Sequence, residues 1–191
     1  MAAAKSLTQA ELAHTLKFIA RRRHAARDRA MLLCGVLAGL RAGEIAGLTI
    51  GDVLNPGNGE IRPEIHLAAH RVKYGHARTI FVSTRLQKEL GTYVKSRKWH
   101  SPEQPLFYTQ HKPRGGFSAD TLSQHMCGLF QAAGIVGASS HSGRKTFLTS
   151  LASQGVSVFV LAALAGHKNI ATTQRYITVN EDLKRRAVEL V

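Results

Sequence analysis

A histidine and an arginine, two residues that bind phosphate groups well, lie three positions apart in HSGRKTFLTSL, which begins at His141. If Ser139 or Ser140 caps a helix here, His141 and Arg144 project from one face of its first turn. That turn offers free backbone amides and the positive end of the helix dipole, which stabilise a phosphate, and an arginine can hold two phosphate oxygens together. A solvated histidine and arginine at a helix end would have the same spacing, so this segment alone leaves both interpretations open.

A second arginine, Arg41 in GLRAGEIAGL, directly follows an apolar run and precedes Glu44 by three positions. A charge held against a buried helix needs a partner, and Glu44 could orient the guanidinium. A purely structural ion pair would look the same. Lys73 falls at the tip of an expected hairpin, where a lysine by itself indicates only a solvated turn.

Near the C-terminus, His167 and Tyr176 stand nine positions apart in AGHKNIATTQRYI, among small residues and threonines. A tyrosine hydroxyl can act as a nucleophile, and a histidine can move a proton near neutral pH. The sequence has no H-E-x-x-H motif, no carboxylate cluster and no P-loop. No metal site and no nucleotide or other cofactor is therefore expected.

The charge of the chain points to a polyanionic partner. Lys and Arg number 26 against 12 Asp and Glu, a formal net charge of +14. Nucleic acid and an anionic membrane surface both fit such a surplus, but the basic residues are dispersed and not gathered in one amphipathic helix, which favours nucleic acid. No apolar run approaches the roughly 20 residues of a membrane span, so no membrane partner is expected. Cys34 and Cys127 lie in apolar surroundings without C-x-x-C spacing, which favours free thiols and a reducing cytoplasm.

The residue patterns predict a mainly α fold with a small antiparallel β-sheet (α+β), in a single domain over 1–191. Thr8 and Glu11 form a capping-box pattern before the first helix, and an apolar run over 27–40 ends near Gly39. Strands are expected near 60–70 and 78–83, with a turn at KYGH between them. Further helices are expected at about 41–53, 85–98, 118–133, 141–154, 157–165, 170–176 and 180–190.

Read together, the reactive segments resemble the sequence boxes of the tyrosine recombinases, the phage-integrase family. GLRAGEIAGL resembles the first-arginine box, HSGRKTFLTSL the His-x-x-Arg box, and LAGHKNIATTQRYI the Gly-His box with its nucleophilic tyrosine. The resemblance extends from about Leu7 to the C-terminus. Three boxes in this order are far more specific than any one of them, and they imply the catalytic-domain fold of that family.

The resemblance implies a site-specific recombinase that cuts DNA without metal or ATP. The Tyr176 hydroxyl would attack phosphorus, leaving a 3′-phosphotyrosyl bond and a free 5′-hydroxyl. A 5′-hydroxyl from another strand can then attack the phosphotyrosyl bond in the reverse direction. Arg41 and Arg144 would clamp the non-bridging oxygens, where negative charge develops. His141 would hydrogen-bond the phosphate and help to take the tyrosine proton. His167 would donate to the phosphate or pack against the helix of the nucleophile.

Two further roles follow from the resemblance. Lys73 would be the general acid, on a β-hairpin that reaches the DNA, although His76 and Arg78 lie in the same segment. Glu44 would orient Arg41 or the neighbouring histidine.

The segment HKPRGGF is a further candidate DNA contact. Lys112 and Arg114 could lie near phosphates, but a solvated turn fits nearly as well.

The chain also departs from the family pattern, which is commonly similar to HDLRHT, with a Leu-Arg pair after the histidine. Here Ser142 and Gly143 stand between His141 and Arg144, and Lys145 replaces the histidine that often follows the arginine.

Larger members of this family carry an N-terminal helical DNA-binding domain, which we do not expect in this chain. It would then be a minimal single-domain form, similar to the fimbrial phase-variation invertases, or a fragment of a longer integrase. The family implies double-stranded DNA as partner, a tetramer on paired sites, and a cytoplasmic, nucleoid-associated location. Two alternatives remain open: a DNA-binding regulator that lacks full recombination, and DNA relaxation like that of a type IB topoisomerase.

Overall fold

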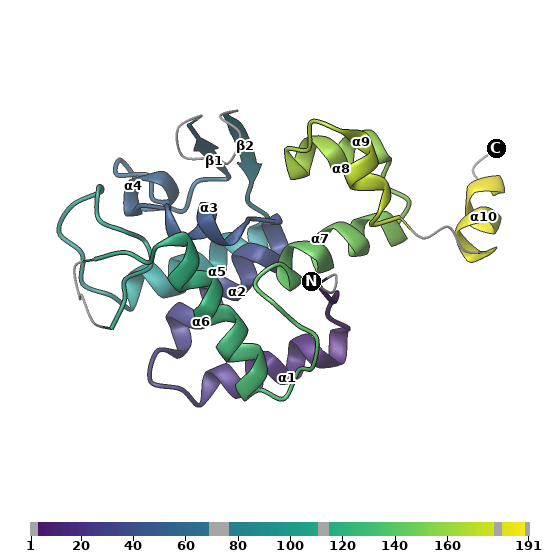
Figure 1. Ribbon diagram of the computed structural model, residues 1–191. Helices are drawn as coiled ribbons and strands as arrows, with labels where there is room; N and C mark the ends of the chain where they lie inside the picture. Colours follow the sequence, from purple (N-terminus) through teal and green to yellow (C-terminus); the bar gives the residue numbers. More distant parts are fainter. Residues whose placement is uncertain (1–3, 69–76, 111–114, 178–180, 190–191) are drawn as a thin grey trace.

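The computed structural model describes residues 4–68, 77–110, 115–177 and 181–189 (Figure 1). Within these residues the chain forms ten helices and one two-stranded antiparallel sheet, which confirms the expected mainly α class. The elements are α1 (Gln9–Ala20), α2 (Ala25–Ala38), α3 (Ala42–Ala46), α4 (Ile50–Val53), β1 (Glu64–Leu67), β2 (Arg78–Phe81), α5 (Thr84–Lys95), α6 (Ala119–Ala132), α7 (Ser142–Ser153), α8 (Val158–Ala165), α9 (Ile170–Gln174) and α10 (Glu181–Val188).

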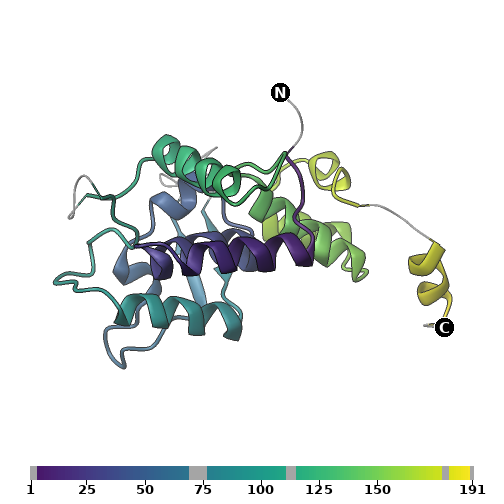
Figure 2. The ribbon, with the colours of Figure 1, turned by 90° about the horizontal axis from the view of Figure 1, so that it is seen from below.

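The helix α2 is the centre of the main hydrophobic core. Met31 and Leu33 on it are fully buried, and the helix contacts α1, α5 and α7. It ends as predicted at Gly39, whose left-handed conformation (φ 63°) places the chain so that Arg41 follows at the start of α3. Figure 2 shows α1 running along this part of the molecule between α5 and α6.

The helices α2 and α7 approach each other closely at two glycines. A Cβ atom added to Gly143 would lie 3.2 Å from the Cα atom of Gly35, closer than side chains normally allow. This contact brings the first turn of α7 against the last turns of α2. Arg144, the residue after Gly143, is thereby placed next to the end of α2.

The hairpin of β1 and β2 packs its apolar face inward. Ile65 pairs with Ile80 and both are buried, and Leu67 pairs with Arg78 at the start of β2. Both strands are shorter than the ranges predicted from the sequence. The turn at KYGH, with Lys73, lies outside the described residues.

A second, smaller core lies between α7 and α8, and the residues that follow α9 pack against it. Leu148, Ala152, Leu161 and Ala165 form it, and Tyr176 packs against it. Figures 1 and 2 show these helices together at one end of the molecule, with α10 apart from the other helices.

The sequence prediction was wrong in one detail of this architecture. The segment 41–53 was expected to be one helical stretch, but it forms the two short helices α3 and α4. Thr49 ends the first helical period because its hydroxyl accepts a hydrogen bond from the Asp52 amide, while the Asp52 carboxylate accepts one from Thr49, so that a new capping box begins there. Ile45 and Leu48 face the core as expected. No helix in the described part of the chain is long and apolar enough to cross a membrane.

Candidate active site

Arg41 is held at the N-terminus of α3 by Glu44. Its backbone amide donates to Glu44 Oε2 at 2.7 Å, and its Nη1 donates to Oε1 at 2.9 Å. The expected i, i+3 partnership is therefore present. The Glu44 side chain is buried, while Arg41 keeps about a fifth of its side-chain surface exposed, 21%.

Arg78 is a third member of this group and was not selected from the sequence. Its Nη2 donates to Glu44 Oε2 at 2.7 Å, its Nε donates to Oε1 at 3.2 Å, and its Nη1 donates to the Leu164 carbonyl at 2.6 Å. Burial alone would raise the pKa of Glu44, but Arg78 and then Arg41 hold it below its usual value, so this carboxylate stays ionised. Arg78 thus joins β2, α3 and the end of α8.

Arg144 lies in the interior, on the first turn of α7. Only 5% of the residue is exposed; Nη1 donates to the Gly39 carbonyl at 2.7 Å and Nη2 to the Ala165 carbonyl at 2.6 Å. Burial, and then the nearby Arg41 and Arg78, lower the pKa of Arg144 to about 9, which leaves it charged at neutral pH.

His167 connects Arg144 to the segment that carries Tyr176. The His167 Nε2 atom lies 2.9 Å from Arg144 Nη2, and Nδ1 lies 2.9 Å from the hydroxyl of Thr173. The imidazole also stacks on the Tyr176 ring, with 6.1 Å between centroids and 18° between planes. Of the two expected contacts of His167, the structure shows the packing against the tyrosine segment.

His141 occupies the N-cap of α7 with an exposed side chain that makes no capping bond. The expected cap by Ser139 or Ser140 was wrong, because both hydroxyls are used otherwise. Ser139 Oγ accepts from the His141 amide at 3.3 Å, and Ser140 Oγ accepts from Ser123 at 2.7 Å. His141 and Arg144 therefore do not share one exposed face, since the histidine points to solvent and the arginine inward.

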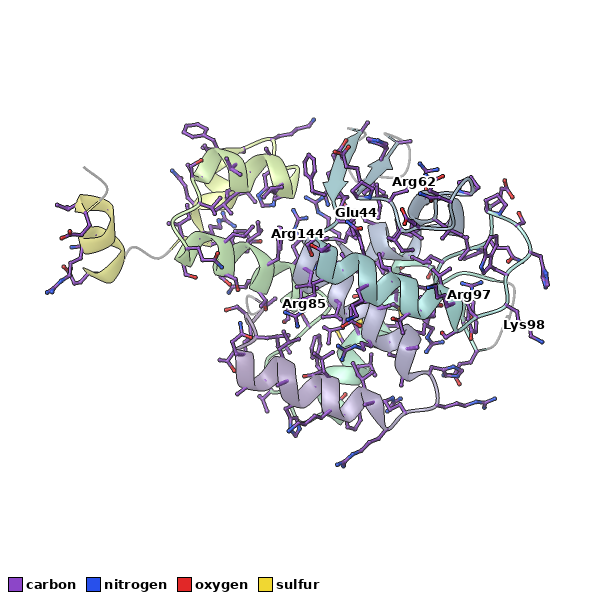
Figure 3. The ribbon with its side chains drawn as sticks, turned by 180° about the vertical axis from the view of Figure 1, so that it is seen from behind. Glu44, Arg62, Arg85, Arg97, Lys98 and Arg144 are labelled. Atoms are coloured by element: carbon purple, nitrogen blue, oxygen red, sulfur yellow. The ribbon has the colours of Figure 1, made fainter. Side chains whose placement is uncertain are left out.

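Two guanidinium groups, those of Arg41 and Arg78, thus bond the carboxylate of Glu44, and a third, that of Arg144, lies near enough to be affected by its charge. Figure 3 shows Glu44 and Arg144 in the interior, where the sheet, α7 and α8 come together. The carboxylate cannot compensate all three charges, and burial, together with the charges of Arg41 and Arg78, lowers the pKa of Arg144. Such a group is electrostatically suited to an anion with several oxygens.

Comparison with known proteins shows which family has a similar sequence. Residues 5–182 match the phage integrase family. The chain belongs to this family. It is 32% identical to the tyrosine recombinase XerA of Pyrococcus horikoshii over 164 residues, which cover 85% of this chain and 54% of that protein. The chain therefore spans about half the length of this curated relative.

Solved structures share the fold of this integrase-family chain. A crystal structure of XerA recombinase superposes with a TM-score of 0.75 at 22% identity, covering 100% of this chain and 66% of that one. The Tn1549 transposon integrase in complex with a circular intermediate DNA gives a TM-score of 0.74 at 23% identity, covering 100% and 67%. The fold is that of a tyrosine recombinase catalytic domain.

Of the residues that the sequence indicated for this integrase-family chain, the structure brings Arg41, Glu44, Arg144, His167 and Tyr176 into one region. Lys73, Lys112 and Arg114 lie outside the described residues, so their expected roles stay predictions. In the described part of the chain, no group of three or more His, Cys, Asp or Glu side chains is arranged to hold a metal.

Arg78 and Thr173 were not predicted as site residues, although the sequence contains a pattern that indicates burial of Arg78. Ile80 in β2 and Val82, the residue after the strand ends, are both buried, and the same period of two places Arg78 on the buried face. A buried arginine needs a carboxylate partner, so the alternation alone would have indicated that Arg78 pairs with an acidic residue. Thr173 gave no such signal, because its contact with His167 depends on how the chain turns between them.

Proposed function

We propose that this chain is the catalytic domain of a site-specific DNA recombinase, which cleaves and rejoins strands through a 3′-phosphotyrosyl link to Tyr176. One observation carries the proposal: Arg144 lies within electrostatic range of the Arg41, Arg78 and Glu44 group, and it contacts the histidine that stacks on Tyr176. Family membership supports the same assignment.

The arrangement of arginines is better suited to bind a phosphodiester substrate than a substrate with one carboxylate group. Trigonal-bipyramidal phosphorus develops negative charge on two non-bridging oxygens during substitution, and each guanidinium can donate two hydrogen bonds. Arg41 is tethered through Glu44 and Arg144 through the Gly39 and Ala165 carbonyls. Because both groups are held before the substrate arrives, little reorganisation is needed when the charge develops.

The chemical step exchanges one phosphoester bond for another. The Tyr176 oxygen forms a bond to phosphorus, its proton passes to a base, and the bond from phosphorus to the 5′ oxygen breaks as that oxygen takes a proton. A 5′-hydroxyl then attacks the phosphotyrosyl bond in the reverse sense and returns the tyrosine. No net phosphoester bond is lost, which accounts for rejoining without ATP.

The remaining roles are assigned by the match to the family boxes. His141, exposed at the start of α7, is proposed to contact the phosphate and help to remove the tyrosine proton. Lys73 is proposed as the acid for the leaving 5′ oxygen, and Lys112 and Arg114 as contacts to the DNA backbone. Glu44 holds Arg41 in place.

Double-stranded DNA is the proposed partner of this chain. The net charge of +14 supports it, and the Tn1549 integrase of similar fold was solved with DNA. We further propose a single catalytic domain over 1–191 that assembles as a tetramer on paired sites, in the cytoplasm and associated with the nucleoid.

The test is covalent capture on a nicked duplex. A random-sequence duplex pool, nicked so that the short strand beyond a cut diffuses away, is incubated with the 191-residue chain and with Tyr176→Phe. A denaturant-resistant adduct is expected for the wild type alone. If neither protein forms it while both bind the duplex, the enzymatic proposal fails and a DNA-binding regulator is the better description.

A DNA site recovered from the captured adducts is then used to distinguish recombination from relaxation. A supercoiled plasmid carrying two copies of that site is expected to give inverted or excised products. Topoisomers without rearranged products would indicate the relaxation activity instead.

A further inference from the structure

Thr173 is a buried polar residue next to the catalytic group to which no role has yet been given. It is fully buried, its hydroxyl lies 2.9 Å from His167 Nδ1, and its carbonyl accepts a hydrogen bond from the Tyr176 amide at 2.9 Å. One residue thus contacts both the imidazole and the backbone of the nucleophile.

The protonation pattern of His167 follows from its partners. An arginine side chain has only donors, so the contact between Arg144 Nη2 and His167 Nε2 requires that Nε2 accept. A neutral imidazole that accepts at Nε2 carries its hydrogen on Nδ1. That hydrogen is then donated to the Thr173 hydroxyl oxygen.

We propose that Thr173 is a positioning residue, which holds His167 in the Nδ1–H form so that its bare Nε2 accepts a hydrogen bond from Arg144. The inference concerns the free protein. Its consequence for catalysis rests on the proposed function, because it assumes that Arg144 binds the scissile phosphate.

The surroundings of His167 favour the neutral ring. Burial, and then the charges of Arg144, Arg41 and Arg78, lower the pKa of His167 to about 4. Among the described residues, Tyr176 also faces it, through ring stacking. In this state the imidazole is an acceptor for an arginine at neutral pH, and it does not donate from Nε2 to a phosphate.

The same contacts connect the clamp to the nucleophile. Arg144 Nη2 is shared between the Ala165 carbonyl and His167, so rotation of the imidazole removes one of its acceptors. The imidazole also stacks on Tyr176, so that rotation alters the packing of the attacking residue. Loss of the Thr173 hydroxyl should therefore reduce cleavage more than DNA affinity.

The first experiment measures the tautomer without any DNA. Histidine-selective ¹⁵N labelling distinguishes a nitrogen that carries hydrogen from a bare one, and a His167→Asn spectrum identifies the signals among the ten histidines. At pH 7 we expect Nδ1 to carry hydrogen and Nε2 to be bare in the wild type. A wild-type ring with hydrogen on Nε2, or a doubly protonated ring, would overturn the inference.

The second experiment compares Thr173→Val, Thr173→Ser and Thr172→Val. Valine keeps the shape and removes the hydroxyl, serine keeps the hydroxyl, and Thr172 is the exposed neighbour that serves as control. Thr173→Val should lose the Nδ1–H preference and cleave the nicked duplex about 10- to 100-fold more slowly, by analogy with the loss of groups that orient metal-bound histidines. The serine variant and Thr172→Val should stay near the wild-type rate.

The outcomes separate this inference from the proposed function. Thermal melting of the three variants shows whether valine merely unfolds the protein, and in that case the wild-type NMR spectrum still tests the Nδ1–H form of His167. If Thr173→Val retains the wild-type tautomer and cleavage rate, the inference is wrong. If the wild type forms no adduct, the recombinase proposal fails, and the NMR result still decides the role of Thr173.

Discussion

At the scale of single residues, the site is a balance of buried charges. Glu44 accepts four hydrogen bonds, two from Arg41 and two from Arg78. A buried ion pair adds little stability over an apolar substitute, but removing one partner leaves the other charge buried and uncompensated. The Glu44 carboxylate is therefore expected to contribute both to the stability of the fold and to the orientation of the Arg41 side chain.

Glu44→Gln should destabilise the fold by about 3 kcal/mol, the cost typical of a broken buried pair. The matched control is Glu89→Gln, which breaks the part-exposed pair with Arg29 and should cost about 1 kcal/mol or less. Urea unfolding of both variants measures the difference. Equal losses would show that the buried arginines find other partners.

The Arg41 and Glu44 pairing was predictable because it is local, with the two residues three positions apart on one helical turn. The contact of Arg78 with Glu44 joins residues far apart in the sequence, and only the fold reveals which carboxylate the buried arginine meets. His141 at the helix cap was mispredicted for a similar reason. Ser140 was already bonded to Ser123, a partner from another helix that no local pattern reports.

At the scale of elements, the spacing between α2 and α7 sets the position of Arg144. The two helices meet at Gly35 and Gly143, and the arginine follows the second glycine directly. Helix positions were largely predictable from hydrophobic period and caps, as at Thr8 and Gly39. The close contact of two helices was not, because a glycine inside a helix gives no indication of what lies opposite.

Gly143→Ala should force α7 away from α2. The added methyl would meet backbone atoms of Gly35 at 3.2 Å, so overpacking should cost about 1–3 kcal/mol and slow cleavage by displacing Arg144. Gly128→Ala is the control, since nothing lies within 4 Å of its added methyl in α6. There, the better helix propensity of alanine should stabilise by up to about 1 kcal/mol. Unfolding and cleavage of both variants would be measured, and similar effects would contradict the prediction.

At the scale of the whole molecule, the site lies where two cores meet. Arg41 and Glu44 lie at α3 and Arg78 on β2, two elements whose apolar residues belong to the main core. Tyr176 packs against the small core of α7 and α8, and His167 stacks on Tyr176. The bonds from Arg78 to the Leu164 carbonyl and from Arg144 on α7 to the Gly39 carbonyl cross between them. A change in how the cores sit against each other would therefore move Arg41 and Arg78 relative to Tyr176, the proposed nucleophile.

The buried charges also predict how the stability of the whole fold depends on pH. The folded pKa of His167, about 4, is lower than its ordinary 6.5, so below pH 6.5 the unfolded chain binds a proton that the folded chain does not. Stability is then fully present above pH 6.5 and falls as the pH drops toward 4. The pKa of Glu44 and that of Asp28 are also lowered in the fold, where burial is outweighed by Arg78 for Glu44 and by His125 and Arg27 for Asp28. Their contribution is lost only at more acidic pH, below the ordinary carboxyl range.

Urea unfolding from pH 7 to 4.5 should separate the histidine from the carboxylates. The wild type is expected to lose stability steadily over this range, and His167→Gln should flatten the dependence because the titrating ring is gone. His24 contributes in the same direction, since burial and then Arg27 lower its pKa, so some slope should remain. His100→Gln, at an exposed position, should leave the wild-type slope intact. An unchanged slope in His167→Gln would mean that the imidazole is not held neutral, and would count equally against the acceptor role that the contact with Arg144 requires.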